Sequence, residues 1–398
     1  MNNRARRRNA GFSLVELMIS VVIGMLALTF ALRMFGGAER NRNAALGGSD
    51  AMQNGMVALF SMSGDAGQAG FGLNDPIIAG CNTVFSDDAH YTLAPATRTG
   101  AAAAIHPLAP VVIEANGAAP DRISFYSGSS PGGTGTLRLT MAYGDGSGAR
   151  IDVDRRPFGF TQGDVIVVAP EKPGADCALA QVSEDPAGLA LPPAKQYLMV
   201  GKDPSYRFNA GVLGASFPAG AARLFNLGRG AALSFHTWSV ADGFLQLRST
   251  DMAVDAATPA TVMDNIVSIK AQYGFDRRAA AAFQPQAGMQ VDAWSATVID
   301  ADGDGVVGGA GDYQRVAAVR LAVVARSKAP EDPARGANCT ATASAPTLFS
   351  AEAPQGVPAV PVKVDLAVAG DPVDWHCYRY RVFETVVTLR NAGWRPQA

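Results

Sequence analysis

The N-terminal segment constrains the fold more than any other part of the chain. Residues 12–32 form a run of 21 residues in which Glu16 carries the single charge. As an α-helix this run is about 31 Å long, which matches a hydrocarbon core of about 30 Å. An ionised side chain without a partner costs about 2.5–3.5 kcal/mol in a membrane-spanning helix, and such a residue commonly serves a function. The sequence therefore predicts a membrane-spanning helix in which Glu16 needs a partner.

Basic residues before the apolar run set its expected orientation. Four arginines lie within the first eight residues, namely Arg4, Arg6, Arg7 and Arg8. This positive charge predicts a cytoplasmic N-terminus and an exported remainder, and four cysteines fit an oxidising compartment. A secretory signal peptide has a shorter apolar region of about 7–15 residues without a carboxylate. A plain membrane anchor fits the run but leaves Glu16 and the Gly11–Phe12 junction unexplained.

The stretch GFSLVELMISVVIGML (11–26) resembles the class III signal of type IV prepilins. In that family a dedicated peptidase cuts after the glycine and N-methylates the new first residue. The resemblance implies a leader over residues 1–11, cleavage between Gly11 and Phe12, and an N-methylated Phe12. Glu16 becomes the fifth residue of the mature chain, where the family has its glutamate. Its expected partner is the amino group of Phe12 on a neighbouring subunit, because paired charges are tolerated at low dielectric and lone ones are not.

Four further segments resemble the PilW type of minor pilin. They are DAGQAGFG (65–72), MDNIVSIKAQYGFD (263–276), VAAVRLAVVARS (316–327) and YRYRVFETVVTLRN (378–391). The resemblance implies a non-enzymatic structural subunit that helps to prime type IV pilus assembly, and its partners would be the prepilin peptidase and other minor and major pilins. The chain would first span the inner membrane once, with a cytoplasmic N-terminus and a periplasmic head, and would then join the pilus at its tip.

Two other functions stay open at this point. A pseudopilin of type II secretion shares the same N-terminal processing. A membrane-anchored periplasmic binding domain or enzyme belongs to a different class. Nucleic acid is not an expected partner, because 33 basic against 35 acidic residues provide no positively charged footprint.

The expected fold class is α+β and pilin-like. A long helix over residues 12–64, with a membrane-spanning part at 12–32, packs on a β-rich antiparallel head over residues 65–398, which forms one domain or two subdomains. Segments rich in β-branched and aromatic residues between Gly, Pro, Asn and Asp clusters predict the strands. The predicted strands are 122–128, 135–144, 163–170, 178–184, 231–240, 243–250, 316–327 and 378–391. Residues 263–274 read as a helical turn that leads into a strand.

The second half of the long helix is predicted to be amphipathic. Ala45, Met52, Met56 and Leu59 recur at helical spacing, so we expect them to form the face that packs on the head. The helix is predicted to end near Ser63–Gly64, because glycine stops helices.

Two patterns that suggest enzymes fail on physical grounds. GSSPG (128–132) matches a serine-hydrolase pattern, but Pro131 has no N–H group for an oxyanion hole. GDGVVG (303–308) matches a dinucleotide-binding pattern, but the aspartates around it would repel a pyrophosphate. The four histidines show no metal-ligand spacing. The sequence therefore predicts that the chain is not an enzyme and requires no cofactor.

Residues 300–312, DADGDGVVGGAGD, form a candidate calcium loop. Asp300, Asp302 and Asp304 followed by Gly305 give the first half of an EF-hand-type loop. The glutamate expected at the twelfth position is missing, and Asp312, one residue later, is the candidate for the remote ligand. The alternative is an ordinary Asp/Gly-rich turn between strands 294–299 and 313–327.

The cysteines Cys81, Cys177, Cys339 and Cys377 permit three connectivities. A bond between Cys339 and Cys377 would close a C-terminal loop of a kind that recurs in pilins. Cys81 and Cys177 would then close the other loop. We expect this pairing.

Overall fold

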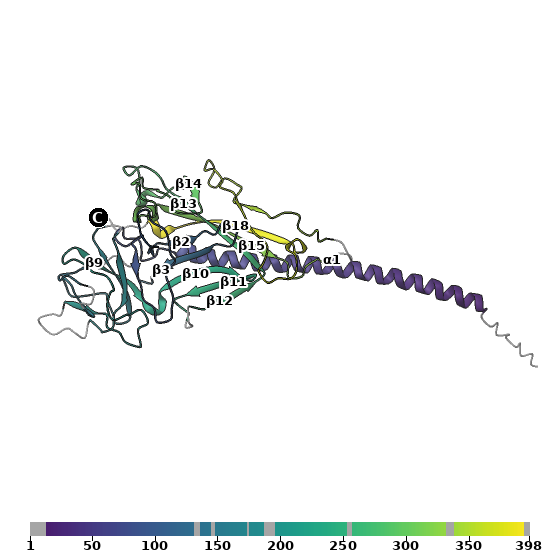
Figure 1. Ribbon diagram of the computed structural model, residues 1–398, viewed down its shortest axis with the longest axis horizontal. Coiled ribbons are helices and arrows are strands. Elements are labelled where there is room, and N and C mark those ends of the chain that lie inside the picture. Colours follow the sequence, from purple (N-terminus) through teal and green to yellow (C-terminus); the bar gives the residue numbers. More distant parts are fainter. Residues whose placement is uncertain are drawn as a thin grey trace, which may run out of the picture.

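A computed structural model describes residues 13–130, 136–144, 148–172, 175–186, 196–252, 257–331 and 338–393, without the side chains of residues 36–47. One helix, α1 (Leu14–Gln68), runs unbroken for 55 residues, or about 82 Å. Its N-terminal half projects beyond the head, and its C-terminal half lies against the strands (Figure 1). The helix ends four residues later than the sequence predicted, and Gly70 follows with a positive φ of 82°.

The rest of the described chain consists of strands joined by loops and short helical turns. The strands are β1 (Thr83–Val84), β2 (Val111–Glu114), β3 (Arg122–Ser127), β4 (Leu137–Arg138), β5 (Arg150–Asp152), β6 (Asp164–Pro170), β7 (Cys177–Gln181), β8 (Tyr197–Met199), β9 (Ala222–Arg229), β10 (Ser234–Ala241), β11 (Phe244–Ser249), β12 (Ala260–Asp264), β13 (Ile266–Phe275), β14 (Ala293–Ser295), β15 (Val316–Arg326), β16 (Thr347–Leu348), β17 (Val362–Lys363) and β18 (Tyr380–Thr388). The short helices are η1 (Gly230–Ala232), η2 (Pro285–Ala287), α2 (Ala310–Tyr313), η3 (Trp375–Cys377) and η4 (Arg390–Gly393).

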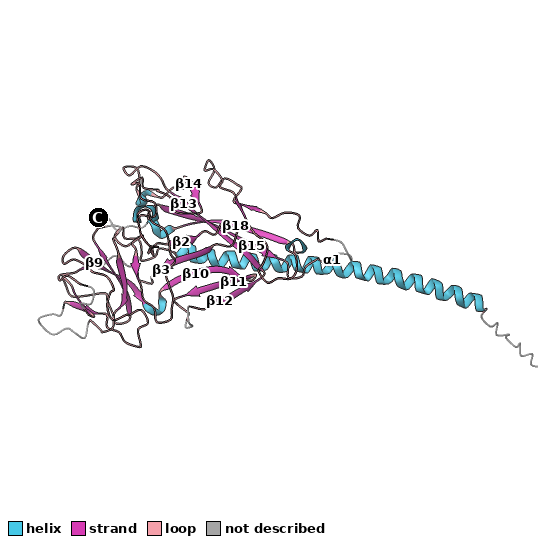
Figure 2. Cartoon of the chain, in the orientation of Figure 1, coloured by secondary structure: helices cyan, strands magenta, loops and turns pink. Residues whose placement is uncertain are grey.

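Three larger sheets build the head (Figure 2). Their strand orders are β1-β7-β6-β9-β4, β12-β11-β10-β3-β2 and β14-β13-β15-β18, and two small sheets pair β16 with β17 and β5 with β8. The named strands pair antiparallel, apart from the parallel pair β1–β7, in which Thr83 lies opposite Cys177. The α+β class predicted from the sequence is therefore confirmed.

The main hydrophobic core joins α1 to the sheets of β3 and β13. Alanines of α1 pack there with Phe125 of β3, Tyr273 of β13 and Val319 of β15. A second core lies between the β6 and β10 sheets around Phe225 and Phe235. Strand β13 is buried along its whole length, because α1 covers one face of its sheet and the chain around β16 and β17 covers the other.

One segment differs in type from its prediction. Residues 263–274 were expected to begin with a helical turn, but β12 runs to Asp264 and β13 starts at Ile266. Asn265 makes the turn between these strands with a φ of 59°, a conformation that asparagine tolerates better than most residues. The prediction of a helical turn is wrong, because the single left-handed residue Asn265 connects β12 to β13.

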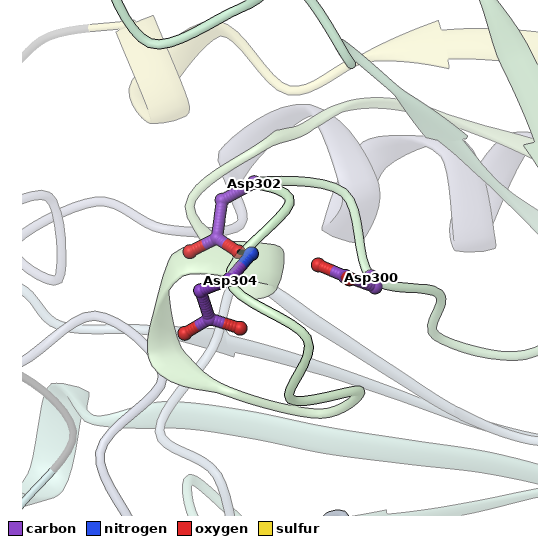
Figure 3. Close-up of side chains that lie close together, drawn as sticks. All are labelled: Asp300, Asp302 and Asp304. Atoms are coloured by element: carbon purple, nitrogen blue, oxygen red, sulfur yellow. Dashed lines mark hydrogen bonds between the residues drawn. The ribbon is translucent and has the colours of Figure 1, made fainter.

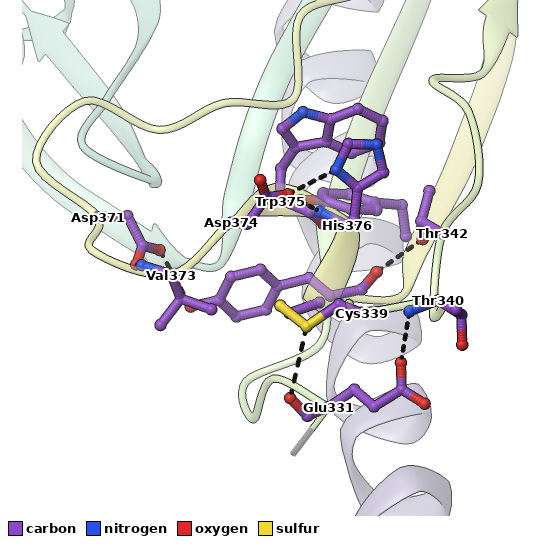
Figure 4. Close-up of a disulfide and its surroundings, with 12 residues drawn as sticks. Glu331, Cys339, Thr340, Thr342, Asp371, Val373, Asp374, Trp375 and His376 are labelled. Atoms are coloured by element: carbon purple, nitrogen blue, oxygen red, sulfur yellow. Dashed lines mark hydrogen bonds and ion pairs between the residues drawn. A yellow bond between two sulfur atoms is a disulfide. The ribbon is translucent and has the colours of Figure 1, made fainter. Parts of the chain in front are cut away.

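Both disulfides join the pairs expected from the sequence. Cys81 bonds to Cys177 across 96 residues, beside the parallel pair β1–β7, and Cys339 bonds to Cys377 across 38 residues. Figure 4 shows the second bond, where Thr342 Oγ1 donates a hydrogen bond to Tyr378 O at 2.6 Å and Thr340 N–H donates to Glu331 Oε2 at 3.0 Å. These bonds hold the C-terminal loop beside the start of β18.

Candidate functional site

The N-terminal end of α1 is closed by a capping box. Ser13 Oγ accepts the Val15 N–H at 3.3 Å, and Glu16 Oε2 accepts the Ser13 N–H at 3.3 Å. This reciprocal arrangement satisfies two N–H groups that a helix leaves without partners. Glu16 therefore has a role inside its own helix that the sequence analysis did not foresee. The predicted cleavage residues Gly11 and Phe12 lie outside the described residues.

The first 22 residues of α1 form an apolar rod. Residues Leu14–Phe35 are long and apolar enough to cross a membrane, and no part of this window is buried in the head. In Figure 1 the rod stands away from every strand. So much exposed apolar surface needs lipid or other helices to cover it. The predicted spanning segment can therefore lie in a membrane or pack against other helices.

The second half of α1 meets the head through small residues. Ala51, Ala58 and Ala66 are buried, and a Cβ atom added to Gly55 would overlap the ring of Phe383 on β18. Met62 is also fully buried on this face, so the close approach to β18 depends on the small residue at position 55. The structure thus places the buried face one residue away from several of the predicted positions.

The predicted face made of methionines is wrong. Met52 and Met56 have 55% and 54% of their surface exposed, and Phe60, on the far side of the helix, is 79% exposed. Leu59 is partly buried against the core, as predicted, and the side chain of Ala45 lies outside the described residues. The helix is rotated so that Gly55, where a Cβ atom would overlap the ring of Phe383, and Met62 face the head, and Met52 and Met56 do not.

A charged cluster fixes the C-terminal end of α1. Asp65 Oδ2 accepts hydrogen bonds from Trp238 Nε1 at 2.7 Å and from His236 Nδ1 at 2.8 Å. The other ring nitrogen of His236 lies 3.0 Å from Asp251 Oδ2. The imidazole therefore bridges two carboxylates and ties the helix to β10. His236 and Asp65 are 171 residues apart in the sequence, and no sequence pattern predicted their contact.

The two carboxylates determine the charge of His236. Burial disfavours the imidazolium, but the hydrogen bonds and negative charges of Asp251 and Asp65 outweigh burial and raise the pKa of His236 to about 9. The pKa of Asp251 is lowered, because His236 hydrogen-bonds to its charged form. His236 is thus a permanent cation at neutral pH and holds α1 through charge-assisted hydrogen bonds.

The acidic loop brings three of its four predicted ligands together. The carboxylate oxygens of Asp300, Asp302 and Asp304 lie within 4.8 Å of one another (Figure 3). Asp300 accepts the N–H groups of Gly303 and Gly305, which curls the loop around its own carboxylate. Burial raises the pKa of Asp302, and the charges of Asp304 and Asp300 add to this rise. A cation would relieve that repulsion.

Asp312 does not join this group, so the predicted remote ligand is wrong. Its Oδ1 accepts the N–H of Ala301 at 2.6 Å and its Oδ2 accepts the N–H of Gly308 at 2.8 Å. Asp302 and Gly309 donate longer bonds to the same carboxylate. Asp312 is fully buried, and it holds the base of the loop closed instead of facing the cluster.

Comparison with protein families matches two parts of the chain. Residues 237–391 match the family model described as type IV pilus-assembly protein W, and residues 6–32 match the prokaryotic N-terminal methylation motif. The chain therefore carries a PilW-type region and a prepilin-type signal. The comparison with curated proteins and the comparison with solved structures each gave no significant match.

One match lies on the strands that contact α1, and the other lies at the start of α1. The PilW match begins in β10, next to His236, and it contains β18 with Phe383 against Gly55. The methylation motif contains the predicted cleavage site and the capping box of Glu16. The contacts that join the head to the signal helix include a charged bridge at the helix end and an apolar seam along β18.

Replacing His236 with glutamine is expected to destabilise the PilW-type head in a pH-dependent way. The folded-state pKa of about 9 lies above the unfolded value of about 6.5, so the stability from the imidazolium is complete below pH 6.5 and is lost as the pH rises through 9. The expected loss is on the order of 3 kcal/mol near pH 6 and much smaller near pH 10. Unfolding of the full mature chain in detergent, followed across this range, measures the difference.

His376→Gln is the control for this prediction. His376 also contacts a carboxylate, Asp374, but its side chain is 40% exposed, and surface pairs contribute little. Its replacement is expected to have little effect at either pH. A destabilisation by His236→Gln that is equal at both ends of the range would contradict the charged bridge.

Calcium is expected to raise the melting temperature of the mature chain if the acidic loop binds it. Binding to the folded state alone adds about 2.7 kcal/mol at a hundredfold excess over the dissociation constant. Asp302→Asn should remove most of this gain, because it deletes a charged ligand. Melting curves with calcium and with chelator test this. An equal melting temperature in both would leave the loop as an ordinary turn, and Asp302→Asn should then be neutral or stabilising.

Proposed function

We propose that the mature chain is a minor pilin that helps to prime assembly of a type IV pilus and is located at the pilus tip. The observation that carries this proposal is helix α1: one uninterrupted helix has an apolar half that no described residue of the head covers and a second half seated on the head. Such a helix suits a subunit that leaves the lipid and packs against other helices. A single-pass anchor requires only the first half.

Processing supplies the chemistry of assembly in this proposal. The prepilin peptidase removes residues 1–11 on the cytoplasmic side and methylates the amino group of Phe12, as the methylation motif implies. That amino group then pairs with Glu16 of a neighbouring pilin, and the pair sets the axial position of one subunit relative to the next. The head stays in the periplasm until assembly, which fits its two disulfides.

A structural role without catalysis agrees with the chemistry of the described residues. Cys377, the neighbour of His376, is bound to Cys339 and has no thiol to act as a nucleophile. The GDGVVG stretch is followed by α2, which has only four residues. In this proposal the acidic loop is a stabilising cation site with no catalytic role.

Recovery of surface fibres tests this function. Fibres sheared from cells that carry a tagged copy should contain the mature chain in small amounts, and deletion of the gene should reduce the number of fibres. Loss of protein secretion with normal fibres would favour a type II pseudopilin. Full-length protein that keeps its leader in the membrane would favour an anchored periplasmic domain.

A further inference from the structure

Strand β18 is an open edge of its sheet. The sheet order is β14-β13-β15-β18, and β18 pairs with β15 over nine consecutive residue pairs without a register shift. The Leu389 N–H donates to Ala317 O at 2.9 Å, and the Ser327 N–H donates to Arg379 O at 2.8 Å. Backbone groups in an antiparallel pair point alternately toward and away from the partner strand. The odd-numbered residues of β18 therefore face β15.

The even-numbered residues of β18 consequently direct their N–H and C=O groups outward. These residues are Tyr380, Val382, Glu384, Val386 and Thr388. In the part of the chain that the structure describes, nothing pairs with this outer side of the strand. Val382 and Val386 are 38% and 41% exposed, and Glu384 and Thr388 are exposed too, so the edge is accessible from Val382 to Thr388.

Among the described residues, no other edge strand of the three larger sheets is as long and as regularly paired as β18. Strands β1 and β4 have two residues each, β14 has three and β2 has four, and the five-residue β12 pairs through a register shift. Proteins protect long edges with prolines, lysines, bulges or short strands, because an open edge recruits other strands. Strand β18 has nine residues, with no proline, lysine or bulge.

We infer that β18 is a docking edge for an extended strand of a different protein. The bound strand would extend the sheet, because only an extended backbone pairs with five outward N–H and C=O groups at once. Residues across from Val382 and Val386 would be apolar and four positions apart. Glu384 already accepts the Phe349 N–H at 2.8 Å and lies 3.9 Å from the buried Arg320, so the residue between them would be polar and uncharged. This inference does not depend on whether the fibre is a pilus or a pseudopilus.

A second copy of this chain does not fit antiparallel to β18. The ring of Phe383 covers Gly55, and Asn391 Nδ2 donates to Gln68 O at 3.0 Å, so β18 and α1 advance in the same direction. Antiparallel pairing of two β18 strands would point their α1 helices in opposite directions. Two chains anchored in one membrane cannot adopt that arrangement.

A pair of proline variants tests the open edge itself. Val386→Pro removes an outward N–H and should leave the melting temperature of the full mature chain in detergent within about 2 °C of wild type. Arg381→Pro removes an N–H that points to β15 and should lower it by more than about 5 °C. Equal melting temperatures for the two variants, whether both high or both low, would overturn the assignment.

A synthetic peptide tests the docking. The probe is a fluorescent nine-residue peptide of threonines with valine at positions 3 and 7. Its fluorescence anisotropy should rise to saturation with the mature chain. Binding should weaken at least tenfold with Val386→Pro and less than about threefold with Val386→Thr, which keeps the N–H. Unchanged binding to Val386→Pro, no binding to wild type, or a wild-type dimer that Val386→Pro dissociates would each refute the inference.

Discussion

A chain in which tryptophan replaces Gly11 is expected to keep residues 1–11 and to be missing from surface fibres. The peptidase must admit a very small residue before the cleaved bond, so a bulky side chain blocks both cleavage and methylation. Four arginines then remain in the chain before the apolar run, on the side expected to be cytoplasmic. Drawing them into hydrocarbon costs about 2.5–3.5 kcal/mol each, which holds the subunit in the membrane. We therefore expect complete loss of incorporation.

Mass spectrometry of the intact chain measures this result. The wild-type protein should begin at N-methyl-Phe12, and the Gly11→Trp chain should retain Met1 or Asn2 at its start. Gly11→Ala is the matched control and should be cleaved at least in part, because a methyl group is the smallest addition. A mature wild-type terminus at any other residue would remove the basis for the prepilin assignment.

The helix boundary shows where local sequence signals are insufficient. Gly64 favours an end of the helix at this position, because glycine in a helix costs about 1 kcal/mol. The helix nevertheless continues to Gln68, because Ala66 is buried in the main core and Asp65 contacts His236 and Trp238. Tertiary contacts outweigh the local cost, and the chain turns only at Gly70, where φ is positive.

The strands of the C-terminal half were predictable because their side-chain patterns are strong. In the predicted strand 378–391 the alternation of side chains puts Phe383 and Val387 on one face, and both pack on the main core. The face of α1 was not predictable in the same way. Hydrophobicity favours Met52 and Met56 as buried residues, but the ring of Phe383 leaves no room for a side chain at Gly55, and the face that turns to the head buries Met62 instead.

Contacts between distant residues were also beyond sequence reasoning. Lys270 lies in the middle of the buried strand β13, and its ammonium group pairs with Asp121, 149 residues earlier. It also donates to the carbonyl oxygens of Gly117 and Ala119 at 2.9 and 3.0 Å. A lysine inside an apolar strand does signal that a buried partner exists, since an unpaired buried charge is costly. It does not say which aspartate is the partner.

Replacing Glu16 with alanine is expected to leave membrane insertion intact and to reduce incorporation into fibres at least tenfold. Removal of the charge makes insertion easier, because the carboxylate is costly in hydrocarbon. Assembly should suffer, because the amino group of Phe12 on a neighbouring subunit loses its partner. The structure adds a second consequence: alanine also removes the acceptor of the Ser13 N–H in the capping box. Quantitative blots of the membrane fraction and of sheared fibres measure both steps.

Two further variants separate these consequences. Glu16→Gln keeps an acceptor at the third helical position, where glutamine also completes a capping box, but it has no charge. Ser13→Ala keeps the charge and removes the cap, at a cost of about 1 kcal/mol. If Glu16 acts by pairing with the methylated amine, Glu16→Gln should fail to assemble as severely as Glu16→Ala, and Ser13→Ala should assemble nearly normally. If Glu16 acts by capping, Glu16→Gln should behave like wild type and Ser13→Ala should fail. We expect the first pattern. A helix cap contributes about 1 kcal/mol, whereas an unpaired charge in the membrane costs about 2.5–3.5 kcal/mol.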